Sequence, residues 1–345
     1  MEFKKIRMGI VGAGTWGETH AAIYKEHLFA DPIAICDMNE QRANTIANKY
    51  DIKKVYTDYL EMAKDPDIDA VAIVTPDFAH ADIAVAMANA GKHLLIEKPL
   101  ATTIEDIKKI CEAVDKNHVR CMVDLHNRWN PPFNKVKQQV QSGKMGDPYN
   151  AYVRLNDIKW VATDMLSWAA KSSILWFLGS HSLDTLRWIF DDDVKRVYSI
   201  KREGILKELG VDTPDVFLTT VEFEKGGIAQ MENGWVTPNG NGNINDFKFN
   251  ILCTKGMIEM DLSDHDLIRE VTEERENVPD VLVSNMVFEQ CKGFSYESIR
   301  DFIERLVDGK EFRVTLEDAK KTAIAILAIH KSAEIGMPVD VEYNI

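Results

Sequence analysis

The chain has 345 residues, which at about 100–200 residues per domain indicates two domains. With 45% hydrophobic and 28% charged residues, its composition is that of an ordinary globular protein and excludes a disordered or fibrous chain. The net charge of −14 repels phosphate backbones and anionic membrane surfaces, so neither a nucleic acid nor a membrane is expected as a partner.

The five cysteines are odd in number, scattered, and form no C-x-x-C pair. They therefore indicate neither a disulfide framework nor a zinc site, and no metal cofactor is expected. The first residues enter a strand-like segment without the apolar core of a signal peptide, and no later stretch approaches the ~20 apolar residues of a membrane span. These features predict a cytoplasmic protein.

Short apolar runs alternate with helical segments in the first part of the chain. The pattern predicts helices that end near Phe29 and Tyr50, and it predicts further elements as follows: strands Arg7–Val11, Ile33–Cys36, Ala70–Val74, His93–Ile96 and Arg120–Leu125, and helices Ala79–Ala90 and Ile104–Asn117. This alternation is typical of βαβ units, and thus of an α/β domain with a doubly wound parallel sheet. We predict that this domain spans residues 1–125.

The rhythm changes after a predicted helix at Asn134–Ser142. Strands then follow one another without intervening helices: Tyr149–Leu155, Val194–Lys201, Val216–Glu224, Ile228–Val236, Asp246–Leu252 and Met257–Leu262. Helices return at Tyr296–Val307 and Leu316–Ile335. Successive strands joined at glycine turns predict a mostly antiparallel sheet, and we assign residues 126–345 to this second α/β domain.

A glycine-rich segment, G-I-V-G-A-G-T-W-G, lies where the first strand meets the first helix. It places Gly12, Gly14 and Gly17 in a G-x-G-x-x-G pattern, with Thr15 and Trp16 between the last two. The glycines permit a tight turn and a close approach of a pyrophosphate to the helix N-terminus. Because the strand and helix flank it, the motif predicts a dinucleotide site of the Rossmann type to which all five residues contribute.

Asp37 closes the second predicted strand, 25 residues after Gly12. An acidic side chain at this position accepts hydrogen bonds from the ribose hydroxyls and repels a 2′-phosphate. We therefore predict NAD as the cofactor in preference to NADP, although Arg42 could still reach a phosphate.

The segment T-P-D-F-A-H-A-D-I-A-V-A-M-A-N-A-G-K-H-L-L-I-E-K-P-L, Thr75–Leu100, closely resembles the hallmark of the Gfo/Idh/MocA oxidoreductases, the glucose-fructose oxidoreductase and inositol dehydrogenase family. N-R-W-N-P at Asn127–Pro131 and S-G-K-M-G-D-P at Ser142–Pro148 extend the resemblance along nearly the whole chain. It implies a Rossmann domain, a second domain with an open, mostly antiparallel sheet, and a sugar-like substrate between them. It also implies association through that sheet into a homodimer or homotetramer.

The resemblance assigns a role to Lys98, which matches the lysine of the family's E-K-P motif that touches nicotinamide ribose and substrate. A lysine beside the reacting hydroxyl can stabilise alkoxide charge or relay a proton. Glu97 is assigned to the cofactor site with it, and Pro99 is expected to follow a cis peptide. Without the surrounding motif, Lys98 would be interpreted as an exposed residue of a loop.

Three further positions of the same motif are assigned to the cofactor site. Thr75 and Pro76 are expected to line the nicotinamide end. His80 either contacts the cofactor or serves as a capping or packing residue of the following helix.

The family's second-domain motif commonly reads D-x-x-x-H-x-x-D, and F-L-G-S-H-S-L-D supplies His181 and Asp184 here. Histidine is suited to act as acid and base, and Asp184 is expected to orient it. The alternative is a core histidine bonded to Asp184. Phe177 replaces the first acid and, at helical spacing, is expected on the same face as His181, where a ring favours the apolar face of a sugar or a hydrophobic aglycone.

Five other residues are candidates for substrate binding. Trp160 and Trp168 could stack on a sugar ring, and Asp164 could supply a carboxylate in place of the missing one. The resemblance places Asn127 and Arg128 near the substrate. Arg128 either binds a hydroxyl or carboxylate or bridges the domains.

These assignments predict a dehydrogenase that transfers hydride from a secondary hydroxyl of a sugar, polyol or glycoside to NAD, with His181 as acid/base, Lys98 assisting and Asp184 orienting. One alternative is a glycosidase or lyase that works with tightly bound NAD through a transient keto-sugar. Another is a non-catalytic sensor of NAD or sugar, which the missing acid favours and the presence of Lys98 and His181 disfavours.

Overall fold

The computed structural model describes residues 5–265, 267–274 and 276–345, and the chain divides into two compact units. Unit 1 comprises the residues up to His126 together with Val283–Lys320, and unit 2 comprises Asn127–Leu282 and Lys321–Ile345. The segment Val283–Lys320, which the sequence analysis placed in the second domain, joins unit 1 because helix α9 (Phe294–Asp308) packs on helix α1 (Thr15–Glu26) and strand β1 (Ile6–Val11).

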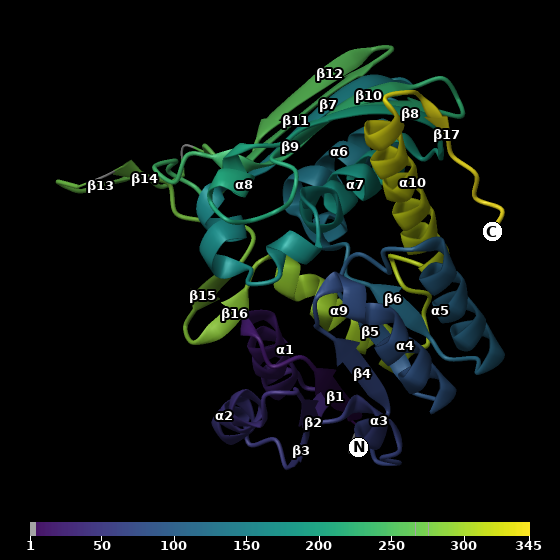
Figure 1. Ribbon diagram of the computed structural model, residues 1–345, viewed down its shortest axis with the longest axis vertical. Helices are drawn as coiled ribbons and strands as arrows, with labels where there is room; N and C mark the ends of the chain where they lie inside the picture. Colours follow the sequence, from purple (N-terminus) through teal and green to yellow (C-terminus); the bar gives the residue numbers. More distant parts are fainter. Residues whose placement is uncertain (1–4, 266, 275) are drawn as a thin grey trace. The chain divides into compact units, whose positions relative to one another are not determined.

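Unit 1 is built on a six-stranded parallel sheet in the order β3-β2-β1-β4-β5-β6 (Figure 1). Besides β1, its strands are β2 (Ala30–Cys36), β3 (Lys54–Tyr56), β4 (Ala70–Ile73), β5 (His93–Ile96) and β6 (Cys121–Val123). The sequence of helices is α1, α2 (Glu40–Tyr50), α3 (Tyr59–Ala63), α4 (His80–Asn89) and α5 (Ile104–Lys116). The strand order reverses direction at β1 and β4, so the carboxyl ends of these two strands form the switch point where ligands bind in such sheets.

Unit 2 is built on a seven-stranded sheet in the order β12-β11-β7-β10-β9-β8-β17. Its strands are β7 (Pro148–Ile158), β8 (Val194–Arg202), β9 (Val216–Phe223), β10 (Ile228–Thr237), β11 (Asn245–Cys253), β12 (Gly256–Asp261) and β17 (Val339–Asp340). Only β7 and β10 pair in parallel, and every other neighbouring pair in this sheet is antiparallel. The predicted α/β fold, a parallel sheet followed by a mostly antiparallel one, is confirmed.

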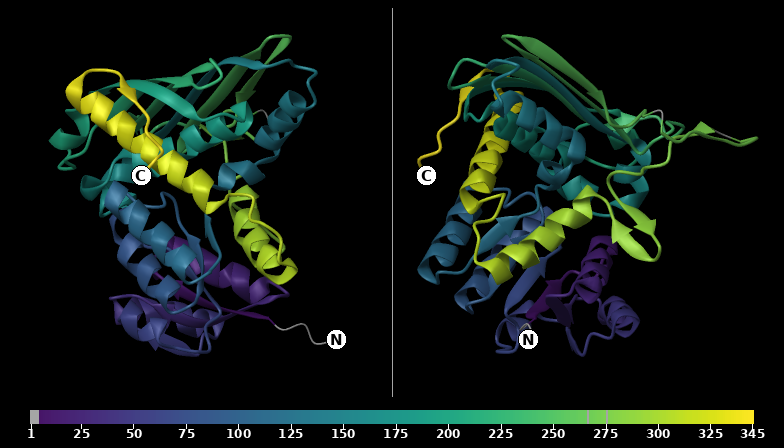
Figure 2. Two further views of the ribbon diagram at one scale, coloured as in Figure 1. Left: turned by 90° about the vertical axis from the view of Figure 1, so that its right-hand side faces the viewer. Right: turned by 180° about the vertical axis from the view of Figure 1, so that it is seen from behind.

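Helices cover one face of the unit 2 sheet and leave the other open (Figures 1 and 2). The covering helices are α6 (Pro131–Gln141), α7 (Ser180–Phe190) and the larger part of α10 (Leu316–Ile335). Strand β9 shows the consequence, because Phe217, Val221 and Phe223 are buried toward the helices while Leu218 points outward and is exposed. This period-two alternation explains why the strands could be predicted from the sequence.

Several short elements lie outside the two sheets. They include the hairpins β13–β14 (Glu270–Val271 and Glu276–Asn277) and β15–β16 (Asn285–Val287 and Gln290–Lys292), the short helix α8 (Ile205–Glu208), and two π-helical segments, Val161–Met165 and Leu175–Gly179. All five cysteines are free thiols. Among the helices that the structure describes, none combines the length and the apolar character that a membrane crossing requires.

Candidate cofactor and active site

The glycine turn between β1 and α1 has the geometry of a dinucleotide site. Gly12 has φ +109°, and a Cβ there would lie 2.2 Å from the carbonyl oxygen of Val74. A Cβ on Gly17 would lie 1.9 Å from the carbonyl oxygen of Gly12, whereas one on Gly14 would meet no atom within 4 Å. Gly12 and Gly17 are thus required by the turn itself. Gly14 keeps the space above it open, where a pyrophosphate can approach the N-terminus of α1.

The carboxylate of Asp37 is fixed beside this turn at the end of β2. Its Oδ2 accepts a hydrogen bond from the backbone N–H of Ala13 at 2.8 Å, and its Oδ1 accepts from the backbone N–H of Asn39 at 2.8 Å. Arg42 donates to the same Oδ1 at 3.2 Å, with its guanidinium largely exposed. Glycines shaped for a pyrophosphate with an ordered acid next to them fit an adenosine dinucleotide.

Trp16 and Glu97, two residues predicted at the cofactor site, contact each other directly. The indole N–H of Trp16 donates to Oε1 of Glu97 at 2.6 Å, which ties the glycine turn to the end of β5. Tyr296 of α9 stacks on Trp16 with ring centroids 6.1 Å apart. Sequence reasoning missed Tyr296, because no local motif signals that a residue so distant in the chain returns to this turn. Thr15, the first residue of α1, is exposed.

The remaining unit 1 candidates lie in the loops after β4 and β5. Thr75, Pro76 and Lys98 are half-buried, and the Lys98–Pro99 peptide is cis, as the family resemblance implies. His80 is fully buried, with Nδ1 2.8 Å from the carbonyl oxygen of Pro99 and Nε2 2.9 Å from that of Thr75. This geometry corresponds to the packing alternative for His80: the ring links the two loops that carry Thr75 and Lys98.

His181 and Asp184 lie on α7 in unit 2, with exposed fractions of 4% and 0%. The carboxylate of Asp184 accepts two hydrogen bonds from Arg128, at 2.9 Å from Nε and 2.7 Å from Nη2. The neighbouring Asn127 donates to Oγ1 of Thr185 at 3.1 Å. Asp184 thus forms a buried bidentate pair with Arg128, and its expected role in orienting His181 stays a prediction. Asn127 and Arg128 therefore anchor α7 within their own unit.

Phe177 lies in the π-helical segment that runs into α7. Its ring packs against Trp168 and Trp235, with centroid distances of 6.2 Å and 5.7 Å. The sequence argument placed Phe177 and His181 on one face by assuming an α-helix throughout. Because hydrogen bonds in a π-helix run from i to i+5, the segment Leu175–Gly179 does not follow that register. Trp235, whose indole N–H donates to Asp157 at 3.2 Å, is a member of this aromatic cluster that sequence reasoning missed.

The other substrate candidates lie on the segment before Trp168. Trp160 is 41% exposed, and its backbone N–H donates to Asn239 at 2.8 Å. Asp164 is exposed and accepts a hydrogen bond from Thr163 at 2.5 Å. Trp168, the third predicted residue in this region, contacts the ring of Phe177.

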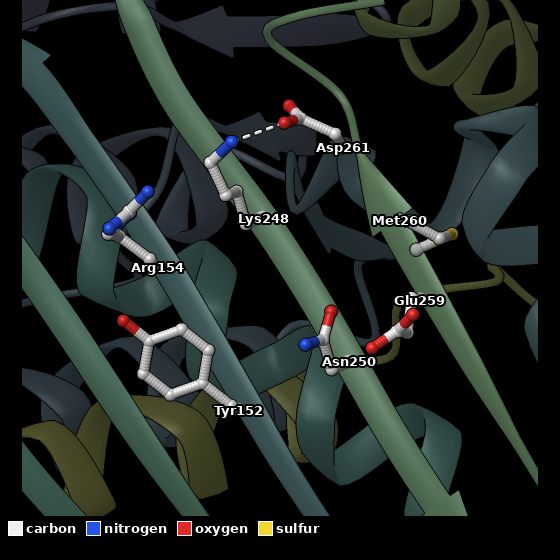
Figure 3. Close-up of a pocket in the computed structure, with 7 residues that line it drawn as sticks. All are labelled: Tyr152, Arg154, Lys248, Asn250, Glu259, Met260 and Asp261. Atoms are coloured by element: carbon white, nitrogen blue, oxygen red, sulfur yellow. Dashed lines mark hydrogen bonds and ion pairs between the residues drawn. The ribbon is translucent and has the colours of Figure 1, made fainter.

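A hollow of about 310 Å³ lies on the open face of the unit 2 sheet, and none of the residues that line it is a predicted site residue (Figure 3). Its lining alternates in charge, with Lys248 paired to Asp261 across β11 and β12, and with Arg154 of β7 paired to Asp246 at 2.9 Å. The complete lining is Tyr152, Arg154, Lys248, Asn250, Glu259, Met260 and Asp261. These residues occupy flat strands, and their chemistry does not match a nucleotide or sugar site that needs a concave apolar wall.

Comparison with known proteins assigns both parts of the chain. Residues 6–125 match the oxidoreductase family with an NAD-binding Rossmann fold, and residues 133–259 match the Gfo/Idh/MocA C-terminal domain. The oxidoreductase YrbE of Bacillus subtilis is 28% identical over 99% of this chain and 98% of its own. Myo-inositol 2-dehydrogenase of Thermotoga maritima is 25% identical over 98% and 99%.

A solved structure of a probable dehydrogenase from Thermotoga maritima shares the fold, with a TM-score of 0.83 at 25% identity over 98% of this chain and 100% of that one. The NAD-binding Rossmann fold of the matching family agrees with the dinucleotide site inferred from the glycine turn and Asp37. The chain belongs to the Gfo/Idh/MocA family of NAD-binding oxidoreductases.

Proposed function

We propose that the protein is an NAD-dependent dehydrogenase that oxidises a secondary hydroxyl of a polyol or sugar, with His181 as acid/base. One observation carries the proposal. This chain has the glycine turn of an NAD site and also both ionisable residues that the family resemblance implies for the reaction, Lys98 after β5 and the buried His181 on α7. The polyol class is supported by the relative that is a myo-inositol 2-dehydrogenase. NAD is favoured over NADP because Asp37 is held at the ribose end of the turn.

The glycine turn and Asp37 would hold NAD, which when bound supplies the hydride acceptor. His181 takes the hydroxyl proton as the carbonyl forms, a role suited to an imidazole whose ordinary pKa lies near 6.5. Lys98 stabilises negative charge on the same oxygen. Asp184 contributes through Arg128: their bidentate pair fixes α7 and thereby the backbone that carries His181.

The aromatic cluster of Trp168, Phe177 and Trp235 favours a substrate with an apolar face. This observation also supports a second candidate, a glycosidase or lyase that uses tightly bound NAD and accepts a glycoside with a hydrophobic aglycone. The two functions differ in their products, because a dehydrogenase accumulates NADH and the lyase releases sugar without net NADH.

The test is a fluorescence titration with NAD and NADP, followed by a screen for NADH formation with inositols, free sugars, uronates and glycosides. We expect preferential NAD binding and NADH formation with at least one polyol or sugar. His181→Ala should lower turnover by ~10²-fold or more and leave NAD affinity unchanged. His118→Asn, which alters an exposed histidine of unit 1, is the matched control. Full turnover in His181→Ala would refute its role, and NAD binding without turnover on any substrate would favour a sensor.

We further propose that the chain forms a homodimer or homotetramer through the open face of the unit 2 sheet. That face exposes apolar side chains on adjacent strands, with Ile200 opposite Leu218 and Leu252 opposite Met257. Its paired charges, such as Arg154 with Asp246, would lie at the same surface. Light scattering coupled to gel filtration should give a mass of two or four chains, and Leu218→Glu should reduce it.

A further inference from the structure

Four ionisable side chains, among them that of Glu97, lie close together inside unit 1. His20 comes from α1, Glu97 follows β5, and Asp124 and His126 follow β6. One ligand atom from each of His20, Glu97 and Asp124 lies within 4.8 Å of the other two, and all three residues are buried. His126 adjoins them, with Nδ1 3.8 Å from Oδ2 of Asp124.

The carboxylate of Asp124 is the group that needs a partner. Its side chain is fully buried, and neither oxygen has a hydrogen-bond partner at ordinary distance among the described residues. An ionised carboxylate in such a place is costly unless a cation compensates it.

The surroundings of His20 and Glu97 resemble those of metal ligands. Metal-bound histidines donate their second ring N–H to an oxygen, and ligating carboxylates accept hydrogen bonds from the protein. Nδ1 of His20 lies 3.0 Å from the hydroxyl of Tyr24, which leaves Nε2 directed to the cluster 3.2 Å from Oε1 of Glu97. Glu97 in turn accepts the indole N–H of Trp16.

We propose that His20, Glu97 and Asp124 bind one divalent transition-metal ion, with solvent completing the coordination. Imidazole nitrogen and carboxylate oxygen are the donors that Zn²⁺ and Mn²⁺ accept together. Two carboxylates and neutral imidazoles carry a charge of −2, which a divalent cation balances. Around tetrahedral Zn²⁺, ligand atoms lie about 3.4 Å apart. The separation of 3.2 Å between His20 and Glu97 fits that geometry, and a carboxylate oxygen of Asp124 lies within 4.8 Å of both.

The competing arrangement contains no ion. The Nε2–H of His20 would then donate to Glu97, the hydroxyl of Tyr24 would donate to Nδ1, and Asp124 would have Nδ1 of His126 at 3.8 Å from its Oδ2. This arrangement satisfies His20 and Glu97 but leaves Asp124 without a close donor. The ion, in contrast, would link α1 to the ends of β5 and β6 and act as a structural element of unit 1.

The experiment uses the full-length, tag-free protein. It is treated with EDTA, dialysed, and titrated calorimetrically with ZnSO₄ or MnCl₂, and its metal content as purified is measured by mass spectrometry. We expect uptake of one ion per chain and a higher melting temperature in its presence. Asp124→Asn and His20→Gln should each weaken binding at least tenfold. His118→Asn and Asp82→Asn, at exposed positions of unit 1, are matched controls that should bind as the wild type does.

Failure of the wild type to take up a stoichiometric ion would overturn the proposal, and so would equal uptake by the wild type, Asp124→Asn and His20→Gln. If Asp124→Asn does not fold, the comparison of metal binding by His20→Gln and by the wild type tests the proposal. The measured quantity is bound ion, not NADH, so the outcome is separate from that of the substrate screen.

Discussion

The two units hold their candidate sites by different means. In unit 1 the backbone defines the site: Gly12 and Gly17 are required because carbonyl oxygens lie where a Cβ would be. In unit 2 side chains define it, since Arg128 and Asp184 form a buried pair that anchors α7. A site made by backbone geometry tolerates few residue types and is visible as a motif. A site made by a side-chain network depends on partners that are distant in the sequence.

The largest expected effect tests whether the side-chain network supports unit 2. Arg128→Ala leaves the fully buried carboxylate of Asp184 without its two guanidinium bonds. Breaking a buried pair in this way costs about 3–5 kcal/mol. We expect that loss in the free energy of unfolding, measured by urea denaturation at pH 7.

The control for Arg128 is Arg196→Ala in the same unit. Arg196 pairs with Asp340 at 2.6 Å, but their side chains are 43% and 66% exposed, so the pair lies at the surface. Because water screens such pairs, this variant should lose no more than about 1 kcal/mol. Equal losses in the two variants would contradict the view that the Arg128 pair anchors α7.

A half-buried histidine of unit 2 should make the protein sensitive to acid. Burial, with a smaller effect from Lys201, lowers the pKa of His330 to about 4, and its Nε2 lies 3.0 Å from Oγ of Ser173. The unfolded chain binds this proton near pH 6.5. Stability is therefore lost as the pH falls from about 6.5 to 4, by about 3 kcal/mol in all, and is unaffected by this group above that window.

His330→Gln should remove this contribution while retaining a hydrogen-bonding group for Ser173. Urea denaturation of both proteins between pH 7 and pH 4 measures it as a difference, so that carboxylates shared by the two proteins cancel. If the free energy of unfolding depends on pH in the same way for the wild type and the variant, then His330 titrates normally in the folded chain.

The glycine turn provides the corresponding test for unit 1. Gly12→Ala places a Cβ 2.2 Å from the carbonyl oxygen of Val74 at a φ of +109°, so the turn must deform. We expect NAD affinity to fall about 100-fold, or about 2.7 kcal/mol, in a fluorescence titration. Gly91→Ala is the matched control: this glycine also has positive φ but lies at the end of α4, with no atom within 4 Å of its Cβ. A similar loss of affinity there would mean that general destabilisation explains the effect.

Much of the fold could be predicted because its determinants are local. Short apolar runs located strands of the parallel sheet, and period-two alternation accounts for those of the unit 2 sheet. Helix α10 begins and ends at the predicted residues. The assignment of α9 could not be predicted in this way, because its amphipathic pattern does not specify which unit covers its apolar face. The π-helical turn at Leu175–Gly179 escaped prediction for a similar reason: its apolar sequence fits an α-helix equally well.

The candidate sites follow the same division. The glycine turn and Asp37 lie within one βαβ segment, so spacing alone located them. Two partners that sequence reasoning missed reach the site from elsewhere in the fold: Tyr296 stacks on Trp16, and Trp235 packs on Phe177. Arg128 was predicted near the substrate, but its pairing with Asp184 was not. These contacts could not be predicted from the identity of the residues, because each contact depends on how the chain packs in three dimensions.

The smallest expected effect concerns Asp37, where a side chain completes the backbone-defined site of unit 1. Asp37→Asn keeps an oxygen for the backbone N–H of Ala13 but removes the charge that repels a 2′-phosphate and that holds Arg42 at 3.2 Å. The released guanidinium can then bind that phosphate. We expect the ratio of NAD to NADP affinity to fall about tenfold, or 1.4 kcal/mol, in paired fluorescence titrations. Glu40→Gln removes one charge from an exposed neighbouring position and should leave the ratio unchanged. If both variants shift this ratio equally, long-range charge sets the preference for NAD. A shift confined to Asp37→Asn would assign the preference to the direct contact of the Asp37 carboxylate.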